Sequence, residues 1–284
     1  MIKFVLGNKK LLLVLNKLPL LRRCFVYDYS KLNAIGDNDF YNLVFSHIIV
    51  SNGLTKTTKS ERFRDLDEVT LGLLKEMNNA AFHDIGVSNG VTSLELYNKI
   101  EHGSLAINFF ISDKYAKIFY KGGAVKKFYD ADGNLISVNF LFLHLSPHIG
   151  KVFFLSRWIF NFFEKKIRVA ENNCKEVLLL APDVYKKIQD GKITLLEFDV
   201  FETKFARPFN FLRCMNVLMP AYFSTEGIKK GVYNLQENLA DGGYLLLGRT
   251  DAENSNHATF YQRKGNELKG VKNINKGFDY NNPA

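Results

Sequence analysis

Hydrophobic and polar positions near residue 84 outline a strand, a tight turn and a helix. The apolar residues before Asp84 predict a buried strand that ends at this acid, and an amphipathic run over 91–100 predicts the helix. Small residues alternate through the turn, at Gly86, Ser88 and Gly90. Glycine lets a ligand lie against the backbone, and the amide groups at a helix start can bind an anionic group. The turn is therefore the first candidate ligand site.

Further apolar runs predict more strands after this helix. The run over 104–111 is continuously apolar, as buried parallel strands are, and Asp113 follows its carboxyl end. The segment 192–200 reads as a later strand that ends at Asp199, and 232–239 reads as a helix. A turn over 240–243 then leads into an apolar strand, and the short runs 258–262 and 268–271 are expected to pair as antiparallel end strands.

Residues 1–25 are apolar and basic, and the first acid of the chain is Asp28. Lysines interrupt the apolar run, so neither a signal peptide nor a membrane-spanning helix is expected. What remains is an amphipathic helix over 10–16 that stops at Pro19. Two interpretations stay open, a helix on a membrane surface and a helix packed on the protein as a cap. Further helices are predicted over 39–51 and 65–77.

Between Asp113 and Lys192 lies more chain than one helix needs. Residues 115–143 predict a hairpin joined by an Asp-Gly turn, and the stretch 139–163 is strongly apolar. This stretch is either a lid over a hydrophobic substrate pocket or a helix buried against the N-terminal segment. His144 and His148 have the spacing of metal ligands, but Pro147 and the lack of a nearby acid argue against a metal site.

The composition of the chain limits the classes of binding partner that we expect. The 284 residues carry a net charge of +9, which favours anionic partners or membrane surfaces. No dense basic patch with interleaved aromatic residues occurs, so nucleic-acid binding is not expected. Cys24, Cys174 and Cys214 are too few and too dispersed for a disulfide framework. We expect a cytoplasmic protein, with membrane association through residues 1–25 left open and the oligomeric state not indicated.

Three segments carry a resemblance to a known family. The turn D-x-G-x-S-x-G at Asp84 resembles motif I of class I S-adenosylmethionine-dependent methyltransferases, with Ser88 in place of the usual middle glycine. The segment 208–223 is similar to the fourth strand of chemotaxis-receptor glutamate methyltransferases, although Asn210 replaces an aspartate and Met215 stands where an arginine is usual. The turn and strand over 240–248 resemble the family's fifth strand.

The resemblance implies an α/β fold with a doubly wound, mostly parallel seven-stranded sheet, the Rossmann-like methyltransferase fold. The methyltransferase domain would span 79–276, with a hairpin-plus-helix insert over 115–172 as a lid. A helical N-terminal addition over 1–78 would form a cap, and 277–284 would be a tail.

The resemblance also implies that the cofactor is S-adenosylmethionine. In a doubly wound sheet Asp113 could accept hydrogen bonds from the ribose, although a helix N-cap and a solvated loop acid stay open as other roles. In the family pattern Asp199 would meet the adenine amino group, and its neighbours would flank the ring. His83 alternates away from the Asp84 face and is read as structural. The residues expected at the cofactor are Asp84, Gly86, Ser88, Asn89, Gly90, Asp113, Phe198, Asp199, Val200 and Met215.

The implied reaction is in-line methyl transfer to a small-molecule or lipid acceptor. Arg213, Asn216 and Tyr222 are expected on the acceptor side, as candidate catalytic residues. Arg213 could hold an anionic substrate or form an ion pair, and Asn216 could orient the acceptor or tie down its loop. The alternatives are a protein carboxyl methyltransferase and a non-enzymatic cofactor-binding protein, the latter suggested by Ser88 and Asn210.

Overall fold

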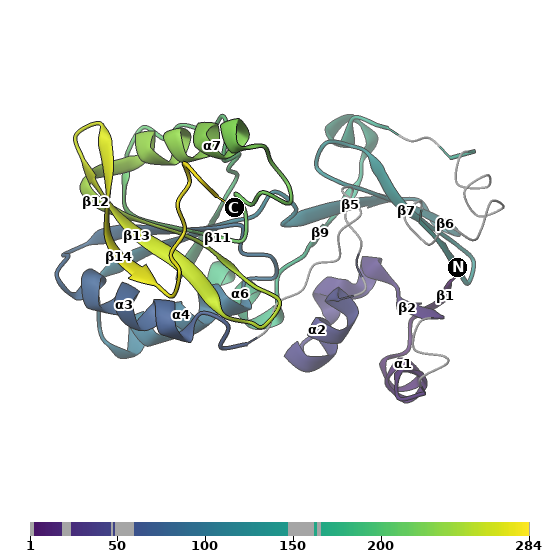
Figure 1. The fold of residues 1–284 in the computed structure, drawn as a ribbon. Helices are drawn as coiled ribbons and strands as arrows, with labels where there is room; N and C mark the ends of the chain where they lie inside the picture. The colour runs from purple at the N-terminus through teal and green to yellow at the C-terminus, as the bar shows by residue number, and fades with distance from the viewer. Residues whose placement is uncertain are drawn as a thin grey trace. The chain divides into compact units, whose positions relative to one another are not determined.

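The computed structural model describes residues 3–18, 24–46, 48, 60–146, 162–163 and 166–283. The chain forms two compact units (Figure 1). Unit 1 comprises residues 1–58 and 115–183, and unit 2 comprises residues 59–114 and 184–284. Residues 1–58 of the expected cap and the expected insert 115–172 therefore lie in unit 1, while residues 59–78 lie in unit 2.

Unit 2 contains the expected seven-stranded α/β sheet, with the strand order β10-β4-β3-β11-β12-β13-β14. The first five strands in this order run parallel to one another, while β13 is antiparallel to both β12 and β14. The sheet is thus mixed rather than purely parallel. Its strands are β3 (Ala80–Ile85), β4 (Ile107–Ser112), β10 (Ile193–Leu196), β11 (Phe209–Met215), β12 (Leu239–Thr250), β13 (Asn256–Lys264) and β14 (Glu267–Ile274).

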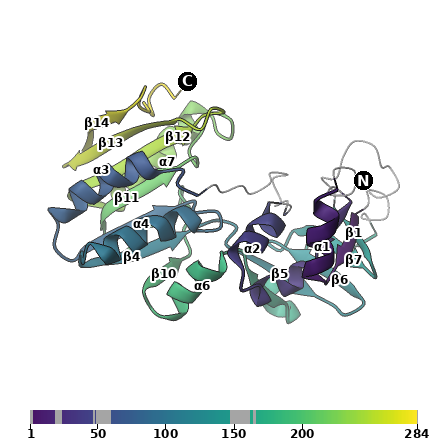
Figure 2. The same cartoon turned by 90° about the horizontal axis from the view of Figure 1, so that it is seen from below.

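Helices cover both faces of this sheet (Figure 2). Side chains alternate along β11, so Leu212 and Cys214 join a hydrophobic core with residues of α7, while Arg213 points to the opposite face and bonds Asp67. That opposite face is covered by α3 and α4. The helices of unit 2 are α3 (Arg64–Lys75), α4 (Val91–His102) and α7 (Thr225–Glu237), and α6 (Pro182–Gln189) crosses the boundary between the units.

Two element boundaries differ from the sequence expectation. The helix α7 begins earlier than predicted, because Ser224 accepts a hydrogen bond from the amide of Gly227 and caps it. Strand β12 also begins earlier, at Leu239, and contains the Gly242–Gly243 turn as an irregularity in its pairing with β11. Asn210 lies at the same irregularity, and its side-chain oxygen accepts a hydrogen bond from the amide of Ala81 at 2.8 Å.

Unit 1 is built on a second seven-stranded sheet, with the order β2-β1-β8-β7-β6-β5-β9. The predicted Asp-Gly hairpin is present as β6 and β7. The N-terminal segment is not purely helical, because β1 and β2 join this sheet. The elements are β1 (Lys3–Leu6), α1 (Lys9–Asn16), β2 (Phe25–Tyr27), α2 (Asn38–Phe45), β5 (Lys117–Lys121), β6 (Val125–Tyr129), β7 (Leu135–Phe140), β8 (Leu143–Leu145) and β9 (Lys175–Leu178), with short 3₁₀ helices at Tyr29–Ala34 and Val169–Asn172.

Most of the apolar stretch 139–163, including Pro147 and His148, lies outside the described residues. His144 is buried, its Nδ1 lies 2.8 Å from Asn139 Oδ1, and burial lowers its pKa to about 3. Within the described ranges, no helix has the length and apolar content needed to cross a membrane. The same ranges hold no cluster of three or more His, Cys, Asp or Glu suited to a metal ion.

The order of strands in unit 2 reverses between β3 and β11. From β3 the chain builds outward through β4 to β10, and it then returns to the other side of β3 as β11. In open α/β sheets, ligands bind at the carboxyl ends of the strands at such a switch point. The two loops at this point pack closely, because a Cβ built on Gly86 would lie 2.2 Å from Val217 Cγ2.

We predict that Gly86→Ala destabilises unit 2 more than Gly191→Ala. Both glycines have positive φ, so each substitution costs about 1–2 kcal/mol. Only Gly86 also meets a neighbour, which adds about 1–3 kcal/mol of overpacking. Urea denaturation of the two variants measures the difference, and equal losses would show that the loops do not pack as described.

Candidate functional site

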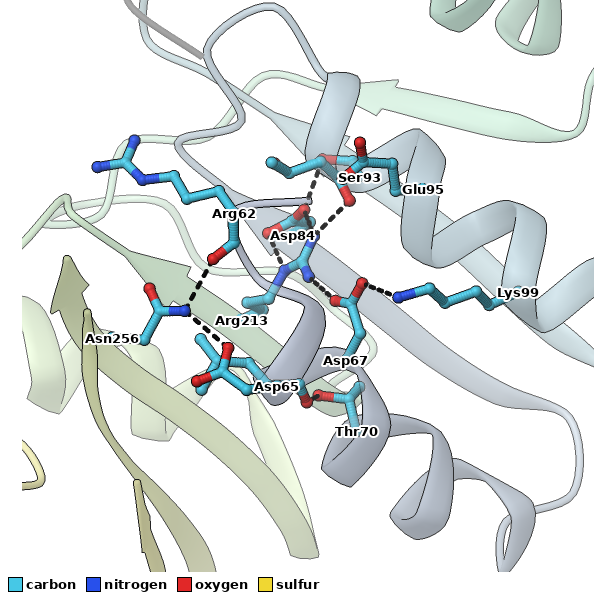
Figure 3. Close-up of polar contacts among 12 residues, drawn as sticks. Arg62, Asp65, Asp67, Thr70, Asp84, Ser93, Glu95, Lys99, Arg213 and Asn256 are labelled. Atoms are coloured by element: carbon cyan, nitrogen blue, oxygen red, sulfur yellow. Dashed lines mark hydrogen bonds and ion pairs between the residues drawn. The ribbon is translucent and has the colours of Figure 1, made fainter. Parts of the chain in front are cut away.

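A buried ion network lies beside the switch point (Figure 3). The side chain of Arg213 is 0% exposed. Its Nε donates to Asp84 Oδ1 at 2.9 Å, and its Nη1 donates to Asp67 Oδ1 at 2.8 Å. Its Nη2 donates to Asp84 Oδ2 and to the carbonyl of Thr92. Every nitrogen of the guanidinium group is therefore bonded inside the protein.

The two acids of the network have further partners. Asp84 also accepts a hydrogen bond from the hydroxyl of Ser93, and Asp67 accepts one from Lys99 at 2.8 Å. Burial raises the pKa of Asp67, while Arg213 and Lys99 act in the opposite direction. Burial alone would lower the pKa of Arg213, but the two carboxylates outweigh it and raise this pKa. The network joins β3, β11, α3 and α4.

This geometry corrects two expectations. Arg213 cannot hold a substrate, because its side chain is buried and forms ion pairs with Asp84 and Asp67. Asp84 has both oxygens engaged by protein donors, so it supports the turn from below rather than contacting a cofactor. The alternation along β11 contains the signal: an arginine within an apolar strand needs a buried acid, and Asp84 is its register partner on β3.

The turn after β3 comes together with the acid after β4. The amide of Ser88 donates to Asp113 Oδ2 at 2.7 Å. Ser88 and Gly90 both have positive φ, and the buried Asn89 accepts a hydrogen bond from the amide of Val91. Gly90 caps α4 without a side-chain hydrogen bond to the first turn. The structure thus brings Gly86, Ser88, Asn89, Gly90 and Asp113 to one edge of the sheet.

The residues after β10 are arranged differently from the expectation. Asp199 is exposed, and its Oδ1 accepts a hydrogen bond from the amide of Phe201. Phe198 stacks on Phe205 at a centroid distance of 5.7 Å, and Val200 is buried in the α7 side of the core. Phe198 and Val200 therefore pack within the protein, which argues against their flanking an adenine ring.

His83 is structural, as expected. It is fully buried, its Nε2 lies 2.8 Å from Ser112 Oγ, and burial lowers its pKa to about 4. Its ring meets Phe198 edge to face.

The end of β11 is tied to the end of β12. Asn216 has a φ of 60°, accepts a hydrogen bond from the amide of Thr250 at 2.7 Å and donates to its hydroxyl at 3.3 Å. Asn216 therefore ties down its loop, which is the second of its two expected roles. Met215 is buried at the last position of β11, while the side chain of Tyr222 is exposed.

Three polar residues near this edge were missed by the sequence reading. The Nε of Arg62 donates to Thr250 Oγ1 at 3.1 Å, and Asn256 donates to the Arg62 carbonyl and to Asp65. Burial lowers the pKa of Arg62, and nearby Tyr222 acts in the opposite direction. The sequence presents Thr250 and Asn256 only as parts of a polar loop, and Arg62 as part of a basic connection, so no pattern distinguished them.

An open hollow of about 440 Å³ lies beside Arg62. It is at the carboxyl edge of the sheet, because β12 ends at Thr250 and Arg62 bonds this residue. Its lining is polar and charged, and consists of Glu61, Arg62, Arg64, Asp65, Glu68, Asn254, Ser255, Asn256 and Asn275.

No family model and no curated protein matches this sequence. Among solved structures, an S-adenosylmethionine-dependent methyltransferase from Clostridium acetobutylicum is similar at 10% identity and a TM-score of 0.35, covering 76% of this chain and 74% of that one. The N-methyltransferase NodS from Bradyrhizobium japonicum, in complex with S-adenosyl-L-homocysteine, matches at 12% identity and a TM-score of 0.36, covering 75% and 73%.

The chain spans less than half of two other matched structures. It covers 46% of a protein from Galdieria sulphuraria, at 10% identity and a TM-score of 0.35. It covers 39% of a protein from Nostoc punctiforme, at 11% identity and a TM-score of 0.34. Similarity at this level does not define an activity.

We predict that Arg213→Met destabilises unit 2 by about 3–5 kcal/mol, because it leaves the buried Asp84 without a cation and Asp67 with Lys99 alone. Lys99→Met is the matched control and should cost less, since the Lys99 side chain is 38% exposed and Asp67 keeps Arg213 as its cation. Urea denaturation measures both.

Adding Asp84→Asn and Asp67→Asn to the Arg213→Met chain should recover part of the loss, because the buried negative charges are then removed. If Arg213→Met lowered the free energy of unfolding by less than Lys99→Met does, the ion network would not be the main polar support of the core.

Proposed function

We propose that the protein binds S-adenosylmethionine at the switch point of unit 2 and transfers its methyl group to a polar small molecule. The observation that carries the proposal is the hydrogen bond between Asp113 and the amide of Ser88. This bond holds Asp113, which follows β4, against the turn that follows β3. In that turn Ser88 and Gly90 have the positive φ of the left-handed region. An acid in this place can accept the hydroxyl groups of a ribose.

The residues of this edge fit an adenosyl ligand in part. Asp113 would hold the ribose, the turn over 86–90 would let the ligand approach the backbone, and the exposed Asp199 remains the candidate for the adenine amino group. Phe198 and Val200 are not included, because Val200 is buried in the core and Phe198 packs against it. When bound, the cofactor supplies an activated methyl group, so the main task of the protein is to align the acceptor.

The hollow beside Arg62 is the proposed acceptor site. It adjoins the loops of the switch point through the bonds that join Arg62, Thr250 and Asn216. Its lining of charged and amide side chains favours a polar acceptor over a lipid. Arg62 carries the charge that Arg213 cannot offer, and Tyr222 lies near it. A carboxylate acceptor held by Arg62 would need no general base.

Asp113→Ala should weaken binding of S-adenosylhomocysteine about 10- to 100-fold, because hydrogen bonds to a charged group contribute about 1.5–3 kcal/mol. Isothermal titration calorimetry measures the affinity. Asp190→Ala is the control, since Asp190 is an exposed acid near the start of β10, at the opposite edge of the sheet. No binding by the unmodified chain, or equal binding by both variants, would refute the cofactor site.

Arg62→Gln should lower methyl transfer about 10- to 100-fold while leaving cofactor affinity unchanged, because it removes a charged partner of the acceptor only. The assay incubates methyl-labelled cofactor with cell extract and separates metabolite, lipid and protein fractions. Arg207→Gln, an exposed arginine before β11, is the control. Label confined to protein would instead favour the protein carboxyl methyltransferase, and no label in any fraction would favour a cofactor-binding protein without enzymatic activity.

A further inference from the structure

Large apolar side chains are exposed at one end of the unit 1 sheet. The turn between β7 and β8 consists of Leu141 and Phe142, whose exposed fractions are 64% and 59%. Phe140, the last residue of β7, is exposed as well. Neither Leu141 nor Phe142 is needed to fill a core at this position, because solvent surrounds most of each side chain.

The backbone of this turn is also unfavourable for its sequence. Two-residue hairpin turns require positive φ and strongly prefer Asn, Asp and Gly. Here Leu141 adopts a φ of 53°, which is uncommon for a bulky residue. Strained conformations of this kind cluster at binding sites, where the strain presents side chains for a ligand. The turn is therefore unfavourable in two respects: its apolar side chains are exposed to water, and the backbone of Leu141 is strained.

Strand β1 extends the same apolar surface. Phe4 is exposed and its ring stacks on that of Phe142, with centroids 6.1 Å apart. The amide of Val5 donates to the Phe142 carbonyl at 2.8 Å, so the turn is held firmly against β1. We call Phe4, Phe140, Leu141 and Phe142 the apolar tip.

Helix α1 adds positive charge next to β1, against which it packs. Leu11 and Val14 lie on one face of this helix and are exposed. Lys10 and Lys17 are exposed, and they lie four residues before and three residues after Val14, so they share its face. No acid occurs before Asp28.

The nearest acids offset only part of this charge. Asp28 is paired with Lys126 outside the segment, while Asp37 is paired with Lys9 of α1. Lys10 and Lys17 have no carboxylate partner among the residues that the structure describes. Exposed apolar side chains beside such lysines are the features with which proteins bind the surface of an anionic bilayer.

We propose that unit 1 docks on anionic lipid membranes, with the apolar tip inserted among the headgroups and Lys10 and Lys17 contacting the lipid charges. Docking of this kind requires no membrane-spanning helix. The proposal is independent of the cofactor site, which lies in unit 2.

Flotation of the full-length protein with vesicles tests this proposal. One set of vesicles contains phosphatidylcholine alone, and the other contains phosphatidylcholine mixed with phosphatidylserine. The unmodified chain should float with the anionic set, and binding should fall as salt is raised. Leu141→Asn combined with Phe142→Gly should lower the partition coefficient at least about tenfold, because two large apolar side chains are lost. This pair creates a favoured turn sequence, so folding should be retained.

Two further variants complete the test. Lys10→Gln combined with Lys17→Gln should weaken anionic binding by about fivefold per charge, since each lysine near such a surface contributes about 1 kcal/mol. Tyr233→Ser, at an exposed aromatic residue of α7 in unit 2, is the control and should bind normally.

Three results would overturn the proposal. The first is failure of the unmodified chain to float with anionic vesicles, or unchanged flotation of the turn variant. The second is a dimer, seen by light scattering, that the turn variant abolishes, because the tip would then be an interface between two copies of the chain. The third is a fall in the melting temperature of the turn variant larger than loss of the Phe4–Phe142 stack explains, which would show that another part of the same chain covers the tip.

Discussion

The ion pairing of Arg213 with Asp84 and Asp67 is the constraint on which unit 2 depends. A guanidinium group that is fully buried is tolerated only when its charge and all its donors are satisfied, and here two carboxylates and a carbonyl do so. These partners come from β3, α3 and α4, while Arg213 itself comes from β11. One side chain therefore fixes the register of the two central strands and the position of both helices on that face.

The fixed register has a direct consequence at the carboxyl edge. With β3 and β11 locked side by side, their loops must leave the sheet at adjacent points, and they do so with positive φ at Gly86, Ser88 and Asn216. The strain of Ser88 is offset by its bond to Asp113, and that of Asn216 by its bonds to Thr250. The acid of the turn motif is thus structural, whereas the edge above it is shaped by backbone and by Asp113. A resemblance in sequence assigns the motif correctly to a turn but cannot tell which of its polar residues face inward.

Local patterns predicted the strands of unit 2 with the turn after β3, and the hairpin of unit 1, since apolar runs and Asp-Gly turns are properties of neighbouring residues. Partners far apart in sequence were harder to predict. The sheet of unit 1 pairs Lys3 with His144, and no periodicity within either segment indicates that contact. The hydrogen bond between Asn256 and the Arg62 carbonyl was equally hard to predict, because 194 positions separate the two residues in the sequence. Arg213 is the exception, since its place within an apolar strand implies a buried acid as partner, and Asp84 lies on the neighbouring strand β3.

The apolar character of the insert admitted two explanations from sequence, a lid over a pocket and a helix buried against the N-terminus. The described residues add a different one. Tyr129, Leu135 and Val138 are buried in a hydrophobic core within unit 1. This packing explains their apolar character without a substrate pocket. Phe140, Leu141 and Phe142 remain outside that core, on a turn whose backbone favours quite different residues. Since neither packing nor turn geometry accounts for these three side chains, an external apolar partner does so best, and the basic helix beside β1 makes an anionic bilayer the partner of matching charge.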